Sequence, residues 1–189
     1  MNQTKKSINP KLDIQIKSLD KKLNLLLKEL KFYNEDQLNR KPKEGSWSVI
    51  QVMHHLMMSE NGSLKYVKKK LSFNPELGKA GIKASLREMV LNTYLGSPFK
   101  WKAPEAISGD NLPQHETFWK TAQQWKNQRI ELREFLETLP DELLNKEVYK
   151  HPFVGRISIP SMLRFFDRHF NRHNKQIQRI IKNYTKQID

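Results

Sequence analysis

Residues 158–184, the last long stretch of the chain, carry an apolar stripe at helical spacing that is interrupted by two histidines. Read at 3.6 residues per turn, one line down this segment holds large apolar residues together with His169 and His173. A second line, roughly opposite, is basic and consists of Arg164, Arg168, Arg172, Lys175, Arg179 and Lys182. The pattern predicts an amphipathic helix with one face in the protein interior and the other in water.

The two histidines of this segment lie four residues apart on the apolar line. This spacing brings imidazoles from successive helical turns together, and helix-borne metal ligands use it. The alternative is that His169 and His173 are hydrogen-bonded residues of an ordinary core, because histidine is often partly buried. A metal site therefore requires a third ligand from another part of the chain.

Length and cysteine content narrow the class of protein. The chain has 189 residues and no cysteine, so we expect one domain with its own core and exclude disulfides, thiolate ligands and a cysteine nucleophile. A metal site would use His, Asp, Glu and water, which suits zinc, nickel, iron or manganese. The first residues lack the apolar run of a signal peptide, and no segment approaches the length of a membrane span. We expect a soluble, cytoplasmic protein.

The charge is strongly basic. The chain has 34 Lys and Arg against 20 Asp and Glu, a formal net charge of +14. Such a balance favours contact with anions, including nucleic acid. The basic residues are spread along the whole sequence, however, which is more typical of a solvated surface than of a binding site. No nucleic-acid-binding motif is present, so a nucleic-acid partner is not expected.

Apolar periodicity predicts an all-α protein. Four long amphipathic helices are expected at residues 11–32, 49–71, 113–139 and 158–184. A looser stretch, 72–111, contains a shorter helix at 84–95 and forms a long crossover between the second and third long helices. This arrangement predicts a four-helix bundle, with residues 1–10 as a flexible tail and residues 11–186 as a single domain.

The second long helix has the clearest start signal. Ser48 is a good N-cap and Gln51 follows at the third helical position, so the two form a capping box. Trp47, just before the cap, is expected to pack on the first turn of the helix. His54 and His55 follow on the same helix and point about 100° apart, so at most one of them reaches the interior site.

Histidines of two helices predict a common site. Inward-facing polar groups of different helices meet in the core of a bundle, which is where bundles build metal sites. His54 or His55 would join His169 and His173. Three imidazoles and a water form an open tetrahedral site of the catalytic type. Without an ion, each buried ring would need another partner, and helix interiors offer few.

Four sequence pieces resemble the DinB/YfiT-like superfamily. They are GSWSVIQVMHHL at 45–56, PFKWKAPE at 98–105, HPFVGRIS at 151–158 and HFNRHNKQI at 169–177. The resemblance runs in order over nearly the whole chain. It implies an up-down-down-up four-helix bundle, commonly a homodimer.

The resemblance also implies a divalent metal, zinc or nickel first, with iron or manganese as alternatives. The ion would be held by one histidine of the second helix and the His-x-x-x-His pair of the last. The family pattern places its first histidine directly before a leucine, which selects His55, before Leu56, over His54. The implied metal ligands are therefore His55, His169 and His173.

Members of this superfamily include thiol-dependent enzymes, among them bacillithiol and mycothiol S-transferases. The resemblance implies an enzyme in which metal-activated water or a low-molecular-weight thiol attacks an electrophilic small molecule. The transferase branch typically has further histidines around the last pair, whereas this chain has Asp167 and Arg168 before His169, and Gln176 after the pair. The alternatives are a non-catalytic metal-binding protein of a stress response and a module that binds polyanions.

Other polar and aromatic residues have weaker interpretations. Glu60 is expected at the surface. His151, in the chain segment that returns to the last helix, either lines the mouth of the site or is a turn residue without a role. Gln176 either orients a ligand or has no part in the site. Trp101 and Trp119 are expected in the core.

Overall fold

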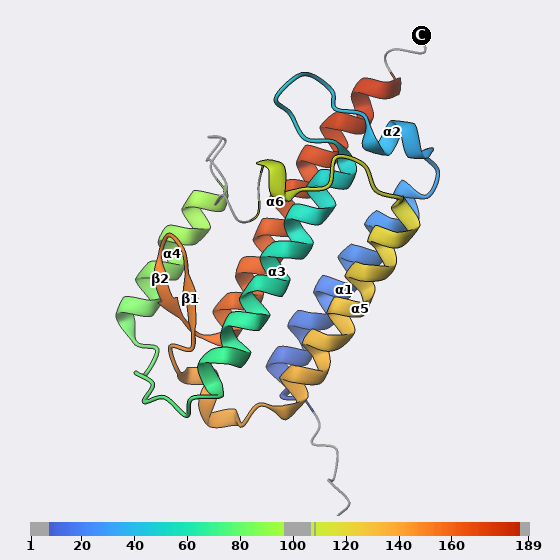
Figure 1. Cartoon of the computed structure of the whole chain (residues 1–189). Coiled ribbons are helices and arrows are strands. Elements are labelled where there is room, and N and C mark those ends of the chain that lie inside the picture. The colour runs from blue at the N-terminus through green and yellow to red at the C-terminus, as the bar shows by residue number, and fades with distance from the viewer. Residues whose placement is uncertain (1–7, 97–106, 108, 186–189) are drawn as a thin grey trace, which may run out of the picture.

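The computed structural model describes residues 8–96, 107 and 109–185. Four long helices pack side by side in it (Figure 1): α1 (Pro10–Leu30), α3 (Val49–Leu71), α5 (Phe118–Thr138) and α6 (Ile159–Thr185). The chain runs up through α1, down through both α3 and α5, and up again through α6. This is the predicted up-down-down-up bundle. Because α3 and α5 run in the same direction, a long crossover must join them.

The ends of the helices follow local chemistry. In α1, Pro10 occupies the first helical position and the side chain of Asn9 accepts a hydrogen bond from the backbone amide of Lys11. In α3, the predicted capping box is present: Ser48 Oγ accepts from the Gln51 amide at 3.2 Å, and Gln51 Oε1 accepts from the Ser48 amide at 3.1 Å. A short helix, α2 (Glu35–Asn39), lies between α1 and α3.

The third long helix starts later than predicted, at Phe118 instead of about residue 113. Two acceptors determine this start. Thr117 caps the helix, and the Glu35 carboxylate accepts the Phe118 amide at 2.9 and 3.1 Å. The carbonyl of Pro113, meanwhile, accepts a hydrogen bond from the Gln51 side chain. A carboxylate that comes from α2 cannot be inferred from the local sequence of α5.

The crossover and the return segment cover one side of α6. The crossover contains α4 (Ile82–Gly96), and the return segment folds into an antiparallel hairpin of β1 (Tyr149–His151) and β2 (Gly155–Ile157). Strands were not predicted, because three residues are too few to show a strand period. Gly155 has a φ of +83° at this turn, a conformation that favours glycine.

Two members of the basic line of α6 contact protein as well as water. Arg164 forms an ion pair with Glu88 of α4, with its Nη2 2.8 Å from Oε2. Arg172 donates from Nη1 to the carbonyl of Leu95 at 3.2 Å. Both contacts fasten α4 to α6. The expectation that this line faces water therefore holds only in part for these two arginines, which are partly exposed and also bind α4.

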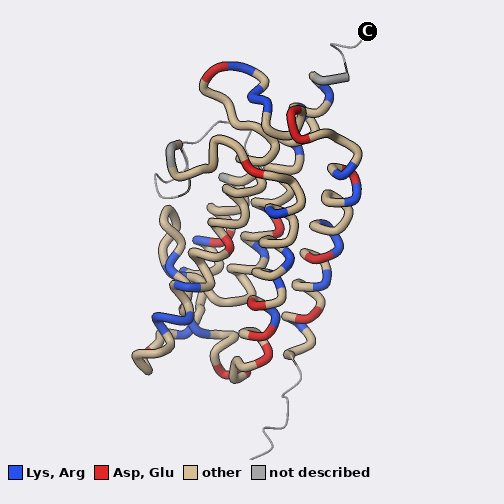
Figure 2. The backbone as a smooth tube through the Cα atoms, turned by 45° about the vertical axis from the view of Figure 1, so that its right-hand side comes forward, with Lys and Arg blue, Asp and Glu red and all other residues tan. Residues whose placement is uncertain are grey.

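Charge on the rest of the molecule is dispersed. Figure 2 shows Lys and Arg interspersed with Asp and Glu along the helices instead of being gathered in one arm. Trp119 was expected in the core but is 69% exposed on α5, and Trp101 lies outside the described residues. Of the helices that the structure describes, none is long and apolar enough to cross a membrane.

Candidate metal centre

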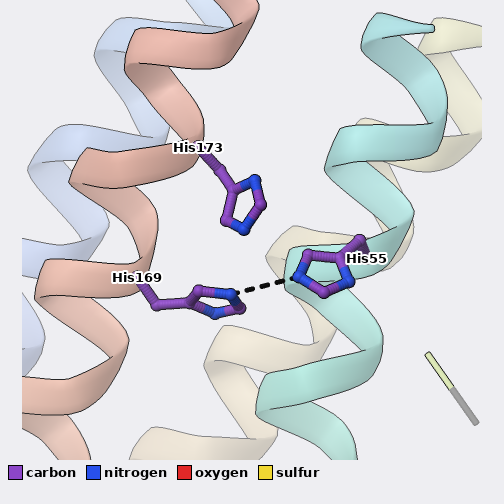
Figure 3. A group of neighbouring side chains, drawn as sticks. All are labelled: His55, His169 and His173. Atoms are coloured by element: carbon purple, nitrogen blue, oxygen red, sulfur yellow. Dashed lines mark hydrogen bonds between the residues drawn. The ribbon is translucent and has the colours of Figure 1, made fainter. Parts of the chain in front are cut away.

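Three imidazoles from two helices meet inside the bundle (Figure 3). His55 comes from α3, and His169 and His173 come from successive turns of α6. The Nε2 atoms of His55 and His169 are 3.1 Å apart. Each of the three offers a nitrogen that lies within 4.8 Å of the others. The structure thus brings together the three histidines that the sequence singled out.

Hydrogen bonds at the far side of two rings set their tautomers. His55 Nδ1 donates to the backbone carbonyl of Ile107 at 2.8 Å, and His173 Nδ1 donates to Gln176 Oε1 at 2.8 Å. When Nδ1 carries the proton, Nε2 of a neutral ring has a free lone pair. Gln176 therefore contacts a candidate ligand, which agrees with the first of the two roles considered for it.

Burial keeps the rings neutral. Desolvation lowers the pKa of His55, and it lowers the pKa of His173 to about 3. It also holds the pKa of His169 well below its ordinary value, with further lowering by His173 and His55. Neutral imidazole is the form that binds a metal ion, so all three rings are in the ligand state near pH 7.

The geometry fits a small divalent ion. Ligand nitrogens about 2.0–2.1 Å from a tetrahedral zinc are about 3.3 Å from one another. Here the Nε2 atoms of His55 and His169 are 3.1 Å apart, and one nitrogen of each of the three rings lies within 4.8 Å of the other two. Three neutral nitrogen ligands leave a fourth position for water or substrate. The cluster suggests a metal ion without identifying which one.

Two aromatic side chains, Trp47 and Phe165, contact the rings of the triad. The Trp47 ring lies 4.9 Å from that of His55, and it is nearly parallel to that of His173 at 6.4 Å. On the other side, Phe165 stacks on His169 at 5.2 Å. Trp47 packs against the neighbouring core, as expected, but its contact with the site was missed. The only signal was its position directly before the cap of the helix that carries His55.

His151 lies behind the triad and not at its mouth. Its side chain is buried, and its ring is 4.6 Å from Phe165, which separates it from His169. His151 Nδ1 accepts a hydrogen bond from the Phe153 amide at 3.3 Å. Burial lowers the pKa of His151 to about 4, so this ring too is neutral near pH 7.

His54 faces a different helix. Its Nε2 lies 3.1 Å from Thr121 Oγ1 of α5, and that hydroxyl donates to the Thr117 carbonyl at 3.0 Å. The hydroxyl proton is thus engaged, so His54 is the donor of the first bond. Of the two adjacent histidines, one enters the triad and the other joins α3 to α5.

Glu60 is buried, which contradicts the expectation that it lies at the surface. Its side chain is 5% exposed and accepts hydrogen bonds from Arg129 Nε and Nη2, both at 2.7 Å, and from Trp125 Nε1 at 3.0 Å. Arg129 lies on the interior line of α5, between Trp125 and Leu132. An arginine at an apolar position needs a buried carboxylate, which is the signal that identifies Glu60.

A sequence model of the DinB superfamily matches residues 18–177 of this chain. The chain belongs to the DinB superfamily. This DinB-superfamily protein is 26% identical over 155 residues to YuaE, an uncharacterized protein of Bacillus subtilis (strain 168), a match that covers 80% of this chain and 88% of YuaE.

Among solved structures, the DinB-superfamily protein is similar to YfiT from Bacillus subtilis, with a TM-score of 0.56 and 17% identity over 95% of this chain and 91% of that one. YfiT is described as a probable metal-dependent hydrolase with an unusual four-helix bundle topology. At this level of identity the similarity shows a shared fold.

Proposed function

We propose that this DinB-superfamily protein is a divalent-metal-dependent hydrolase that acts on an electrophilic small molecule. The observation that carries the proposal is the neutral triad of His55, His169 and His173, held by hydrogen bonds and contacted by two aromatic side chains. The description of YfiT, which shares the fold, supports the same class of reaction.

The chain's own residues have separate tasks in this proposal. The Nε2 atoms of the triad hold the ion, while the Ile107 carbonyl and Gln176 orient two of the rings. Bound zinc or nickel, or alternatively iron or manganese, lowers the pKa of a water towards neutrality and polarises a carbonyl. Trp47 and Phe165, which contact the rings of His55 and His169, would reduce the access of water to the site and so strengthen electrostatic interactions there.

The electrostatics favour an anionic fourth ligand. The triad contains no carboxylate, so the charge of a divalent ion is not neutralised by its protein ligands. Arg172 adds positive charge nearby, and this charge contributes to the lowered pKa of both His169 and His173. Hydroxide meets this requirement, and so does a thiolate. The S-transferase branch typically has further histidines around the last pair. This chain has Gln176 there, and Gln176 orients His173. This difference from the S-transferases favours hydrolysis.

Metal content tests the ligand assignment. Tag-free protein incubated with zinc or nickel and then desalted is expected to retain about one ion per chain. His55→Ala, His169→Ala and His173→Ala should each retain almost none. His54→Ala is the matched control, since it removes the adjacent ring, which bonds to Thr121 instead. If wild type retains no ion, or the triad variants retain as much as His54→Ala, the site is not a metal centre.

Turnover tests the reaction class. The metal-loaded protein should hydrolyse members of a panel of activated esters, amides and lactams, and chelation or loss of a triad histidine should abolish this activity. The same electrophiles are offered with several low-molecular-weight thiols, and products are separated by mass. Thiol conjugates without hydrolysis would assign the protein to the S-transferases. Metal binding without either product would leave a non-catalytic metal-binding protein.

A further inference from the structure

A groove lies between α1 and α5, apart from the histidine triad. These two helices stand side by side in Figure 1, whereas the triad comes from α3 and α6. The groove has a volume of about 320 Å³, at the lower end of the range for small-molecule sites. Its walls include Asp20, Leu23 and Asn24 of α1 and Arg129, Ile130 and Arg133 of α5.

Short polar side chains of α1 leave room for this groove. The buried residues of α1 are all Leu or Ile, but Asp20 and Asn24, one helical turn apart, line the groove beside them. Apolar side chains complete the walls, since Leu23 is buried and Ile130 of α5 is 57% exposed. The groove thus combines an apolar lining with a polar end.

The polar end of the groove contains a buried donor and a buried acceptor. The side chain of Arg129 is 4% exposed, and Glu60 accepts hydrogen bonds from its Nε and Nη2, which leaves Nη1. Asp20 Oδ1 lies 3.5 Å from Nη1, an ion pair too long for a good hydrogen bond. Within the part of the chain that the structure describes, both atoms are buried and neither has a hydrogen-bond partner. Buried polar atoms are nearly always bonded, so this pair points to a ligand.

The two atoms together specify the polar group that would bind them. Nη1 of Arg129 needs an acceptor, and Oδ1 of Asp20, next to it, needs a donor. An amide presents a carbonyl oxygen beside an N–H and satisfies both. A carboxylate would satisfy only the arginine and would be repelled by Asp20, while an amidinium would satisfy only Asp20 and would be repelled by Arg129. The apolar walls suit a hydrocarbon ring attached to the amide.

We propose that the groove between α1 and α5 binds a small neutral amide with an apolar body. The amide oxygen accepts a hydrogen bond from Arg129 Nη1, and the amide N–H donates to Asp20 Oδ1. Contact with these buried atoms requires side chains at the groove to shift, and two of them are free to do so, because Asp20 is 32% and Ile130 57% exposed. The proposal rests on the groove and this pair of atoms and does not depend on the proposed metal chemistry.

Three probes of the same shape test the polar group. Benzamide offers a donor and an acceptor, benzoate only acceptors and benzamidinium only donors. Titration of the full-length, metal-free protein, followed by ligand-observed NMR, should give benzamide a Kd on the order of 1 mM. The other two should bind at least about tenfold more weakly, because each leaves one buried atom unbonded. Equal binding of all three, preference for a charged probe, or no binding of benzamide would overturn the proposal.

Variants of the groove test the location. Asp20→Ala removes the acceptor and its negative charge, so benzamide should bind about tenfold more weakly and benzoate more tightly. A purely structural role of Asp20 would not reverse the preference in this way. Ile130→Trp fills the groove and should abolish benzamide binding, whereas Ile14→Trp, at a 70% exposed position of α1 outside the groove, should preserve it.

Benzamide binding that is the same in Ile130→Trp and Ile14→Trp would place the probe elsewhere on the protein and refute the proposal. An unchanged preference for benzamide in Asp20→Ala would also refute it. If Asp20→Ala fails to fold, which circular dichroism would show, the comparison of the two tryptophan variants decides.

Discussion

Gln176 illustrates how one side chain outside a candidate ligand set determines what the set is able to do. It lies three residues after His173 on α6 and accepts the Nδ1 proton of that ring at 2.8 Å. This bond selects the tautomer in which Nε2 faces the other two histidines. Partners of this kind orient the ligand and raise its basicity.

We expect Gln176→Ala to weaken metal affinity about 10- to 100-fold, because the His173 ring loses its orienting acceptor. Gln176→Glu, which keeps an acceptor, should retain most of the affinity. Competition against a chromophoric chelator measures both. Gln178→Ala is the control: Gln178 lies on the same helix as Gln176, and its substitution removes a hydrogen bond to Glu29 of α1 without touching the triad. An affinity for Gln176→Ala equal to that of this control would show that Gln176 has no orienting role.

Between elements, the contact of α3 with α5 depends on a buried ion pair. Glu60 and Arg129 are 5% and 4% exposed and share two hydrogen bonds. Without Glu60, the buried Arg129 would keep only a longer contact of its Nη1 with Asp20 Oδ1, at 3.5 Å, so its charge would be poorly compensated, which is far more costly than losing an ion pair in water.

Glu60→Gln should therefore lower the free energy of unfolding by about 3–5 kcal/mol. Glu131→Gln removes the carboxylate of an ion pair between the same two helices, but that pair, with Lys68, is exposed to solvent, so its loss should cost less than about 1 kcal/mol. Urea unfolding of the metal-free proteins gives both values. Similar losses in the two variants would mean that the Glu60–Arg129 pair is no more important than a surface pair.

At the scale of helices and strands, the sequence predicted those features that depend on residues close together in the chain. The four helices, the Ser48–Gln51 capping box and the selection of His55 over His54 followed from periodicity, cap spacing and family resemblance. Features that need a partner far away in the chain were missed. Glu60 was misplaced because its partner is 69 residues away, and α5 starts late because Glu35, from α2, caps it. The contact of Trp47 with the triad likewise depends on how two helices pack.

Across the whole molecule, neutral buried histidines link folding to pH. The pKa of His151 is about 4 in the folded protein and about 6.5 in the unfolded chain. Above pH 6.5 the ring is neutral in both states and contributes no pH dependence. Below pH 6.5 the unfolded chain binds a proton that the folded protein excludes, so stability falls as the pH drops towards 4.

His151→Phe should remove this part of the acid sensitivity, a slope of up to about 1.4 kcal/mol per pH unit between pH 6 and 4. Urea midpoints of metal-free wild type and variant at pH 7, 6, 5 and 4.5 measure the difference in slope. His115→Phe, at an exposed position, should keep the slope of wild type. If His151→Phe loses stability with acid as steeply as His115→Phe does, His151 is protonated in the folded state.

The separation of the triad along the chain bears on the order of assembly. His55 precedes His169 by 114 residues, and the crossover that supplies the Ile107 carbonyl lies between them. During synthesis, a chain that has emerged only as far as α5 offers a single imidazole at this place and cannot retain an ion. If the triad is a metal centre, as proposed, capture of the ion would follow the docking of the last helix, and ion occupancy would report that the bundle has closed.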